Sequence, residues 1–302
     1  MILAFDIGGT TMKGGRARSP HEIEVLDRVP TPGHDLDAFV GVLARAVVEC
    51  PEPPRALAAA IPGIVDVDTG LGVVANIPCL TGIPIRERLE AALGLPVLIA
   101  NDADCFALAE VAVGAGRGHR VVFGVILGTG VGGGLVSDGR LVNAAGGFGG
   151  EWGHGPVAAR IAGEPPVKIP RFACGCGLSG CLDATVSARG MERLHRHLHA
   201  AEATSLEIVA RWRAGDAAAR RTIEIWLEIA SAPLAVLVNT VAADIVPVGG
   251  GLGGSVELVA ALDAAVRAST LRRFGRPLVV PALCQVEPGL VGAAALGLAA
   301  VG

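Results

Sequence analysis

Aromatic residues are scarce in this chain of 302 residues, at 3% of the total, and tyrosine is absent. A core therefore has to be built from Ala, Val, Leu and Ile. Hydrophobic residues make up 51% of the chain, which is ample for one large domain or two modest ones. The 43 glycines predict many tight turns.

Long apolar runs are also missing. No run reaches the roughly 18 residues needed to span a bilayer. The longest candidates, near 229–243 and 288–302, are interrupted by Pro233, Asn239 and several glycines. The apolar start of the chain is broken at Asp6, which does not fit a signal peptide. We therefore expect a cytoplasmic protein with no membrane partner.

The chain has no excess of basic residues, and its net charge is −4, which argues against nucleic acid as a partner. Three of its seven cysteines lie within residues 174–181. Without a signal peptide, this clustering predicts a reducing compartment and a metal site rather than disulfides. The other four cysteines are isolated and are expected to be small buried hydrophobes: Cys50, Cys79, Cys105 and Cys284.

The cysteine cluster predicts a zinc site. Cys174, Cys176 and Cys181 supply three thiols, and His154 lies upstream as a fourth ligand. A Cys3His set is a recurring tetrahedral zinc site, and the intervening glycines allow three thiolates to converge. Glu151 and Asp183 flank the segment, so the same loop is expected to hold carboxylates beside a ligand. The alternative is three reduced cysteines in a glycine-rich loop, with an unrelated histidine.

Strands and helices alternate along the chain, and one strand–turn–strand unit occurs twice. The first unit runs through residues 2–7, a Gly/Thr turn and residues 12–17; the second runs through 121–127, another Gly/Thr turn and 131–136. This echo suggests a loose internal duplication and an α/β fold with two similar lobes. The stretch 114–120 is the candidate hinge.

The two Gly/Thr turns are candidate phosphate sites. Gly8-Gly9-Thr10 and Gly128-Thr129-Gly130 offer backbone N–H groups and a hydroxyl. A strand follows each, which fits neither a Walker A loop nor a dinucleotide fingerprint; an ordinary hairpin turn is the alternative. Gly249-Gly250-Gly251 follows a strand and is a third candidate site, where a flat nucleotide could pack on the backbone. An ordinary turn is the alternative. Asp6 is expected to contact Mg²⁺ through water, or to cap the first turn.

Asn101 and Asp102 lie where a strand gives way to a helix. Capping of that helix is one interpretation. Alternatively, Asp102 accepts a proton from a substrate hydroxyl in phosphoryl transfer. Asp104 is expected on the exposed side of the first turn. The histidines at 195, 197 and 199 alternate at i, i+2, which predicts a solvated helix rather than a metal site.

Together these segments resemble the ROK family of bacterial sugar kinases, over essentially the whole chain. The motifs are DIGGT (6–10), IPG (61–63), NDAD (101–104), LGTGVGGG (127–134), EWGH (151–154), CGCGLSGC (174–181) and GGG (249–251). The resemblance implies the actin/hexokinase-like, ribonuclease H-like pair of α/β lobes with a cleft between them. A small lobe would comprise residues 1–116, completed by the helix 289–302. A large lobe, 117–288, would carry the zinc loop.

The resemblance also implies an activity: transfer of the ATP γ-phosphate to a sugar hydroxyl, usually O6, with Mg²⁺, a structural zinc and a homodimeric enzyme. Asp102 would be the catalytic base. The sugar contacts would be Asn76, Asn101, Asp102, Glu151, His154 and Asp183. The nucleotide and its phosphates would meet Asp6, Gly8, Gly9, Thr10, Gly128, Thr129, Gly130, Gly249, Gly250 and Gly251. Zinc would be held by His154, Cys174, Cys176 and Cys181.

Subfamily features favour N-acetylglucosamine as the sugar. The interval between His154 and Cys174 and the segments at 29–32 and 101–108 resemble N-acetylglucosamine kinases, whereas Trp152 resembles fructokinases. Glucose, fructose and mannose remain alternatives. The chain departs from the family where Thr11 replaces a frequent lysine, with Lys13 two positions on. It departs again where NDAD replaces NDAN and where Asp183 replaces a glutamate.

A different class of function is a sugar-responsive repressor or a non-catalytic sensor. Repressors of the family carry a helix-turn-helix before the DIGGT strand. That strand begins here at Ile2, so we do not expect a DNA-binding module. The presence of Asp102 argues against a sensor without activity.

Overall fold

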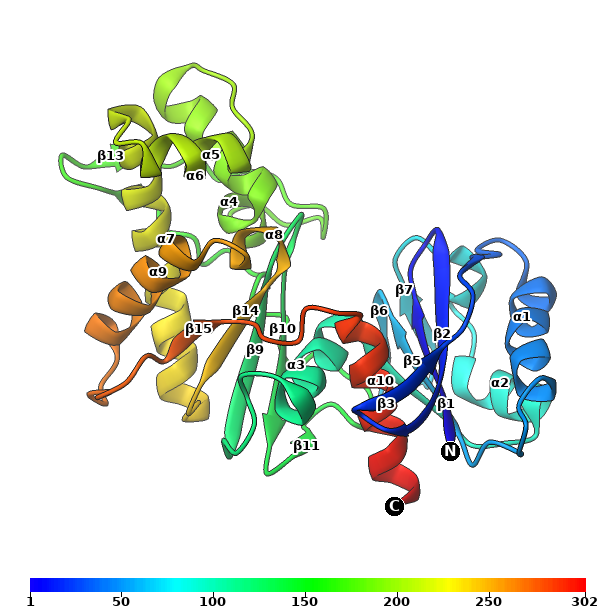
Figure 1. The fold of residues 1–302 in the computed structure, drawn as a ribbon. Coiled ribbons are helices and arrows are strands. Elements are labelled where there is room, and N and C mark those ends of the chain that lie inside the picture. Colours follow the sequence, from blue (N-terminus) through cyan, green and yellow to red (C-terminus); the bar gives the residue numbers. More distant parts are fainter. The chain divides into compact units, whose positions relative to one another are not determined.

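The computed structural model describes residues 1–302, which form a mixed α/β protein (Figure 1). The chain divides into two compact units. The first contains Met1–Gly118, Gly134–Gly149 and Leu283–Gly302; the second contains His119–Gly133 and Gly150–Ala282. Neither unit is a continuous stretch of sequence.

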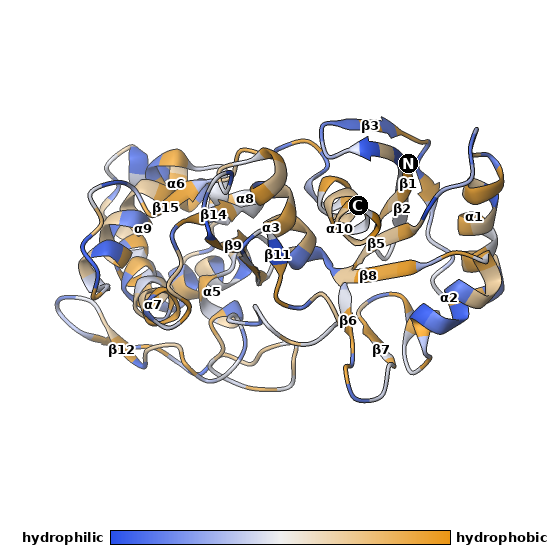
Figure 2. Ribbon diagram, turned by 90° about the horizontal axis from the view of Figure 1, so that it is seen from below, coloured by the Kyte–Doolittle hydropathy of each residue, from blue (hydrophilic) through white to orange (hydrophobic).

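The first unit is built on a sheet with the strand order β3-β2-β1-β5-β8, and β4 pairs with β2. Its central strands β1 and β5 run parallel and are almost completely buried, as a parallel sheet covered on both faces requires. The edge strand β3 carries two glutamates and is coloured as hydrophilic in Figure 2, which blunts that edge against further pairing. The strands are β1 (Ile2–Ile7), β2 (Thr11–Ser19), β3 (Glu22–Val25), β4 (Val29–Pro30), β5 (Leu57–Ile61) and β8 (Val97–Asn101).

Helices cover both faces of this sheet (Figure 1). α1 (Leu36–Val48) and α2 (Ile85–Leu93) lie on one face, and α10 (Pro288–Val301) lies on the other, against β1, β5 and α3 (Asp102–Val113). Asp35 caps α1, because its carboxylate accepts from the Ala38 N–H at 3.0 Å. The sequence did not predict the hairpin of β6 (Gly63–Val65) and β7 (Gly72–Val74), or the short helix η1 (Pro78–Leu80).

The second sheet has the order β11-β10-β9-β14-β15. Its strands are β9 (Val121–Leu127), β10 (Val131–Ser137), β11 (Arg140–Leu141), β14 (Val246–Gly249) and β15 (Val279–Pro281). The second unit adds α4 (Asp183–Val186), α5 (Ala188–His199), α6 (Ser205–Arg213), α7 (Ala217–Val241), α8 (Gly250–Gly253) and α9 (Val256–Ser269). A small hairpin joins β12 (Ile161–Ala162) to β13 (Val167–Lys168).

By length and composition, α7 alone among these helices could cross a membrane, but 56% of its most apolar window is buried inside the protein. Trp226 in this helix is fully buried, and its indole N–H donates to the Val186 carbonyl at 2.9 Å. These are the properties of a core helix.

The structure differs from two sequence-based expectations. The predicted division left residues 134–149 in the second lobe, whereas they belong to the first unit. A Cβ on Gly134 would lie 2.7 Å from the Ala103 carbonyl, so β10 passes directly over the start of α3. The expectation of a solvated histidine face is wrong for His195, which is buried and pairs with the Thr222 hydroxyl at 2.8 Å.

Candidate active site

The first Gly/Thr turn joins β1 to β2 in the first unit. The Gly8 N–H donates to the Thr11 carbonyl at 2.9 Å, and the Thr31 hydroxyl donates to the Gly8 carbonyl at 2.6 Å. A Cβ on Gly9 would lie 2.7 Å from the Cβ of Asn76, so only glycine lets Asn76 pack on this turn. The structure therefore brings a predicted sugar contact against the predicted phosphate turn, and leaves Thr10 exposed.

Asp6 lies at the base of that turn among charged groups. The Lys13 ammonium is 3.6 Å from the Asp6 carboxylate and 2.8 Å from that of Glu287. Burial raises the pKa of Asp6, and Lys13 opposes this effect. Lys13 is on the same face of β2 as Thr11, because side chains alternate along a strand. Its ammonium is engaged by two carboxylates of its own unit.

The second and third glycine turns lie together in the second unit. The Gly128 N–H donates to the Gly130 carbonyl at 3.0 Å, which closes the β9–β10 turn. Gly250 has φ +80°, and a Cβ there would lie 2.5 Å from the Leu127 carbonyl. This close approach of two backbones explains why a glycine follows β14 at position 250, and it groups two of the three predicted nucleotide segments.

The start of α3 carries Asn101 and Asp102. The Asn101 side-chain oxygen accepts from the Ala103 N–H at 2.8 Å, so Asn101 is the N-cap of this helix. Its amide donates to the Gly63 carbonyl at 3.2 Å, which fixes the helix start to β6. Asp102 follows as the first helical residue, and its side chain is exposed. The predicted base is thus held at a rigid junction of strand, helix and hairpin.

The expectation that Asp104 is exposed is wrong. Asp104 is 2% exposed, because β10 and the loop after β11 cover this side of α3. Its carboxylate accepts from the side-chain amide of Asn143 at 3.2 Å. Asn143 belongs to no motif that would have identified it from the sequence.

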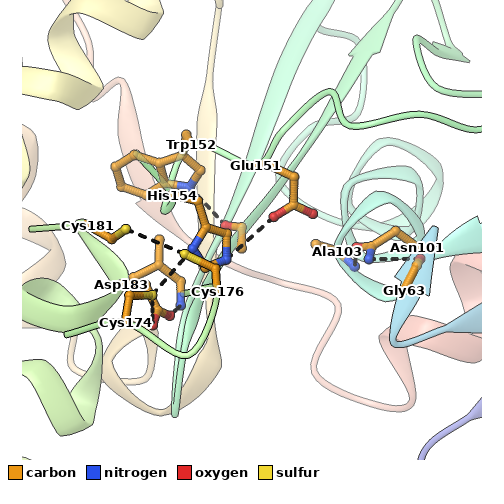
Figure 3. A network of polar contacts seen from close by, with 12 residues as sticks. Gly63, Asn101, Ala103, Glu151, Trp152, His154, Cys174, Cys176, Cys181 and Asp183 are labelled. Carbon is orange, nitrogen blue, oxygen red and sulfur yellow. Dashed lines mark hydrogen bonds and ion pairs between the residues drawn. The ribbon is translucent and has the colours of Figure 1, made fainter. Parts of the chain in front are cut away.

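The predicted metal ligands lie together in the second unit (Figure 3). One nitrogen or sulfur from each of His154, Cys174, Cys176 and Cys181 falls within 4.8 Å of all the others. A tetrahedral zinc with Zn–S near 2.3 Å and Zn–N near 2.0–2.1 Å has edges of about 3.8 Å between two sulfurs and about 3.6 Å between sulfur and nitrogen. The observed Sγ–Sγ distance of Cys176 and Cys181 is 3.7 Å, and that from Cys174 Sγ to His154 Nδ1 is 3.6 Å. The donor set therefore fits zinc in type and spacing.

The pKa values of the three thiols bear on how a cation would bind among them. Burial raises the pKa of the Cys174 thiol to about 12 and also raises the pKa of Cys181. The Leu178 backbone N–H lowers the pKa of Cys176. A metal would have to displace the protons of the Cys174 and Cys181 thiols on binding.

The acidic residues flanking the cysteine loop are tied to its surroundings. Glu151 is 3.8 Å from Nε2 of His154, the ring nitrogen that faces away from Cys174. Asp183 accepts from the Val131 N–H at 2.8 Å, and its other oxygen lies 3.5 Å from Cys174 Sγ. Asp183 thus connects the cysteine loop to the Gly128–Gly130 turn, a link that spacing in the sequence does not reveal.

Trp152 packs within the second unit. Its indole N–H donates to the Gly132 carbonyl at 2.9 Å, and its ring meets Phe123 edge-on at 6.4 Å between centroids. A Cβ on Gly133 would lie 2.9 Å from this ring. The tryptophan therefore supports the β9–β10 hairpin.

Two α/β units, each with a hairpin around a Gly/Thr turn, and an aspartate at a capped helix start define a phosphotransferase of the actin-like class. The chain belongs to the ROK family, whose profile matches residues 2–300. It is a sugar kinase of this family.

The relatives agree on that class. The chain is 36% identical to the N-acetylgalactosamine kinase AgaK of Shewanella sp. (strain ANA-3), over 98% of this chain and 96% of that protein. It is 34% identical to the N-acetyl-D-glucosamine kinase of Pasteurella multocida (strain Pm70), over 99% of both. Among solved structures, the ROK hexokinase from Thermus thermophilus has a TM-score of 0.83 at 31% identity, covering 99% of this chain and 98% of that one.

Proposed function

We propose that this protein phosphorylates N-acetyl-D-glucosamine at O6 with ATP, giving N-acetyl-D-glucosamine 6-phosphate. The observation that carries the proposal is the match over nearly the whole chain, at 33–36% identity, to relatives named for N-acetylated hexosamines. The contacts at the start of α3 support a kinase mechanism, because they hold Asp102 on rigid backbone.

In this proposal Asp102 accepts the proton of the attacking hydroxyl. Asn101 fixes Asp102 through its cap on α3 and its hydrogen bond to Gly63. Phosphoryl transfer depends mainly on positioning and on neutralisation of charge, so a base on a capped helix start suits it. The remaining sugar contacts are Asn76, Asn101, Glu151, His154 and Asp183.

ATP would be bound by the glycine turns. Their backbone N–H groups suit phosphate oxygens, and the Gly249–Gly251 segment suits the base. Asp6 would lie near a Mg²⁺ ion bound with ATP, and that ion would neutralise charge on the phosphates. One Asp183 oxygen accepts from the Val131 N–H, so its contact with sugar would use the other oxygen, directly or through water.

We expect a cytoplasmic homodimer. An apolar cavity of about 520 Å³ over α7, lined by Trp152, Val157, Pro233 and Val236, is suited to apolar contact. Val157 and Val236 are more than half exposed there.

The proposed zinc is structural: His154 and the three cysteines would hold it, and it would fix the loop that carries Asp183. Cys176→Ser is expected to lose one zinc per chain and to raise KM for sugar more than KM for ATP. Metal analysis and steady-state kinetics measure both. Cys50→Ser is the control, because Cys50 lies far from the cysteine cluster in the sequence and its thiol donates to the Ala46 carbonyl, as a hydroxyl can. Active enzyme without zinc would contradict the assignment.

A coupled ADP-release assay over a panel of sugars tests the substrate. We expect the highest kcat/KM for N-acetylglucosamine and measurable activity with glucose, because a single misfit in a pocket costs only about 1–3 kcal/mol. A kcat/KM for fructose or glucose ten times that for N-acetylglucosamine would refute the proposed substrate but not the kinase activity.

N-acetylgalactosamine is the second candidate, because a relative at 36% identity is named for it. The two sugars differ only in the orientation of the hydroxyl at C4. The same panel therefore decides between them, provided that both epimers are assayed at equal concentration.

A further inference from the structure

The loop between β11 and Glu151 is closed by one side chain. The Asn143 amide donates to the Gly149 carbonyl at 2.6 Å, and its oxygen accepts from the Gly149 N–H at 3.2 Å. One side chain thus satisfies both backbone groups of a residue six positions away. This pairing removes most of the conformational freedom that a glycine-rich segment would otherwise keep. Residues 143–149 are called the Asn143 loop below.

Glycine is required inside this loop. A Cβ on Gly149 would lie 2.6 Å from the Asn143 side-chain oxygen, so any other residue would disrupt the pairing. Gly146 and Gly147 have φ of +105° and +117°, values that favour glycine. The Gly147 N–H donates to the Val65 carbonyl at 3.1 Å, which fastens the loop to the end of β6.

Asp104 determines which way the Asn143 amide points. A carboxylate only accepts hydrogen bonds, so the Asn143 nitrogen must face Asp104 and its oxygen must face the Gly149 N–H. The pair is buried, with 2% of Asp104 and 9% of Asn143 exposed. Asp104 is two residues from Asp102 on the first turn of α3, where a negative charge is favourable.

We propose that Asp104 and Asn143 are positioning residues for the acceptor sugar: they hold the Asn143 loop against the start of α3 and the end of β6. The same helix start and hairpin hold Asn101 and Asp102. The chain then continues from Gly149 to Glu151, a predicted sugar contact. Neither residue needs to touch substrate, because displacement of a positioning group by about 1 Å is enough to cost a large factor in rate. This inference rests on the proposed function.

The test compares Asn143→Ala, Asn143→Asp and Asp104→Asn. Both Asn143 variants are expected to raise KM for N-acetylglucosamine about tenfold or more, to leave KM for ATP within about twofold, and to speed amide hydrogen exchange at Gly147 and Gly149. Asp104→Asn is expected to change KM for N-acetylglucosamine by less than about threefold, because its amide oxygen can still accept the hydrogen bond from Asn143. If Asn143→Ala fails to fold, Asn143→Asp has the same shape and carries the same test.

A double variant separates positioning from packing. Asn143→Asp with Asp104→Asn restores a carboxylate–amide pair but places a carboxylate against the Gly149 carbonyl. We expect no rescue of KM for sugar. Glu90→Ala is the matched control, because it removes another part-buried hydrogen bond of the first unit, to the Val97 N–H at 3.0 Å. It is expected to lower thermal stability without raising KM for sugar.

Two results would overturn the proposal: Asn143 variants that melt earlier while keeping a wild-type KM for sugar, or full rescue by the double variant. Wild-type enzyme without activity on any N-acetylhexosamine refutes the proposed substrate class instead. Hydrogen exchange then still decides whether Asn143 orders the loop, and unchanged exchange rates at Gly149 in both Asn143 variants would refute that.

Discussion

Asp102→Asn is expected to lower kcat by about 10²–10⁴-fold, the usual effect of losing a general base. The substitution keeps the size and hydrogen-bonding shape of the side chain but removes its capacity to take a proton. Binding of ATP and of sugar should persist. Steady-state kinetics give kcat, and calorimetric titration gives the affinities.

Asp37→Asn is the matched control. Asp37 is also an exposed aspartate in the first turn of a helix of the first unit, α1. Its substitution is expected to leave kcat unchanged. Near wild-type turnover in Asp102→Asn would mean that another group accepts the proton, or that positioning alone carries the reaction.

Gly292→Ala is expected to destabilise the protein strongly. A Cβ at this position would lie 2.6 Å from the Cα of Cys105 and closer still to its carbonyl group. Both helices contact through backbone at this point, so no side chain can turn away. Overpacking typically lowers folding stability by about 1–3 kcal/mol, and we expect Gly292→Ala to cost about 3 kcal/mol or more. A calorimetric scan should then show a melting temperature lower by roughly 5–10 °C.

Gly41→Ala supplies the control for Gly292→Ala. Gly41 lies inside α1, and a Cβ there would meet nothing within 4 Å. The same substitution is expected to stabilise the protein by about 0.5–1 kcal/mol, because alanine is the better helix former. A Gly292→Ala protein as stable as the wild type would show that α3 and α10 can separate at no cost.

Much of the fold follows from local signals. The strands expected at 2–7, 12–17, 121–127 and 131–136 and the helix expected at 289–302 are observed within one or two residues of those ends. Asn101 caps α3, which was one of its two interpretations, because a cap is a contact between residues two or three positions apart. The Cys3His cluster could also be predicted from the sequence, because three of its ligands fall within eight residues.

What the sequence did not predict depends on contacts between distant residues. Glu110 is fully buried, and its carboxylate accepts from the backbone N–H groups of Ala115, Leu283 and Cys284. Asp104 meets Asn143 across 39 positions. Both carboxylates look like exposed helix residues in the sequence, because their partners are ordinary loop residues with no pattern of their own.

The threading of the chain has a consequence for its synthesis. α10 is translated long after β1, β5 and α3, yet it packs against all three. At about 5–20 residues per second, the 175 positions from Val113 to Pro288 take about 10–35 s to translate. During that time the apolar surfaces that α10 covers have no partner on the nascent chain. The first unit is therefore completed only after the second unit has been translated.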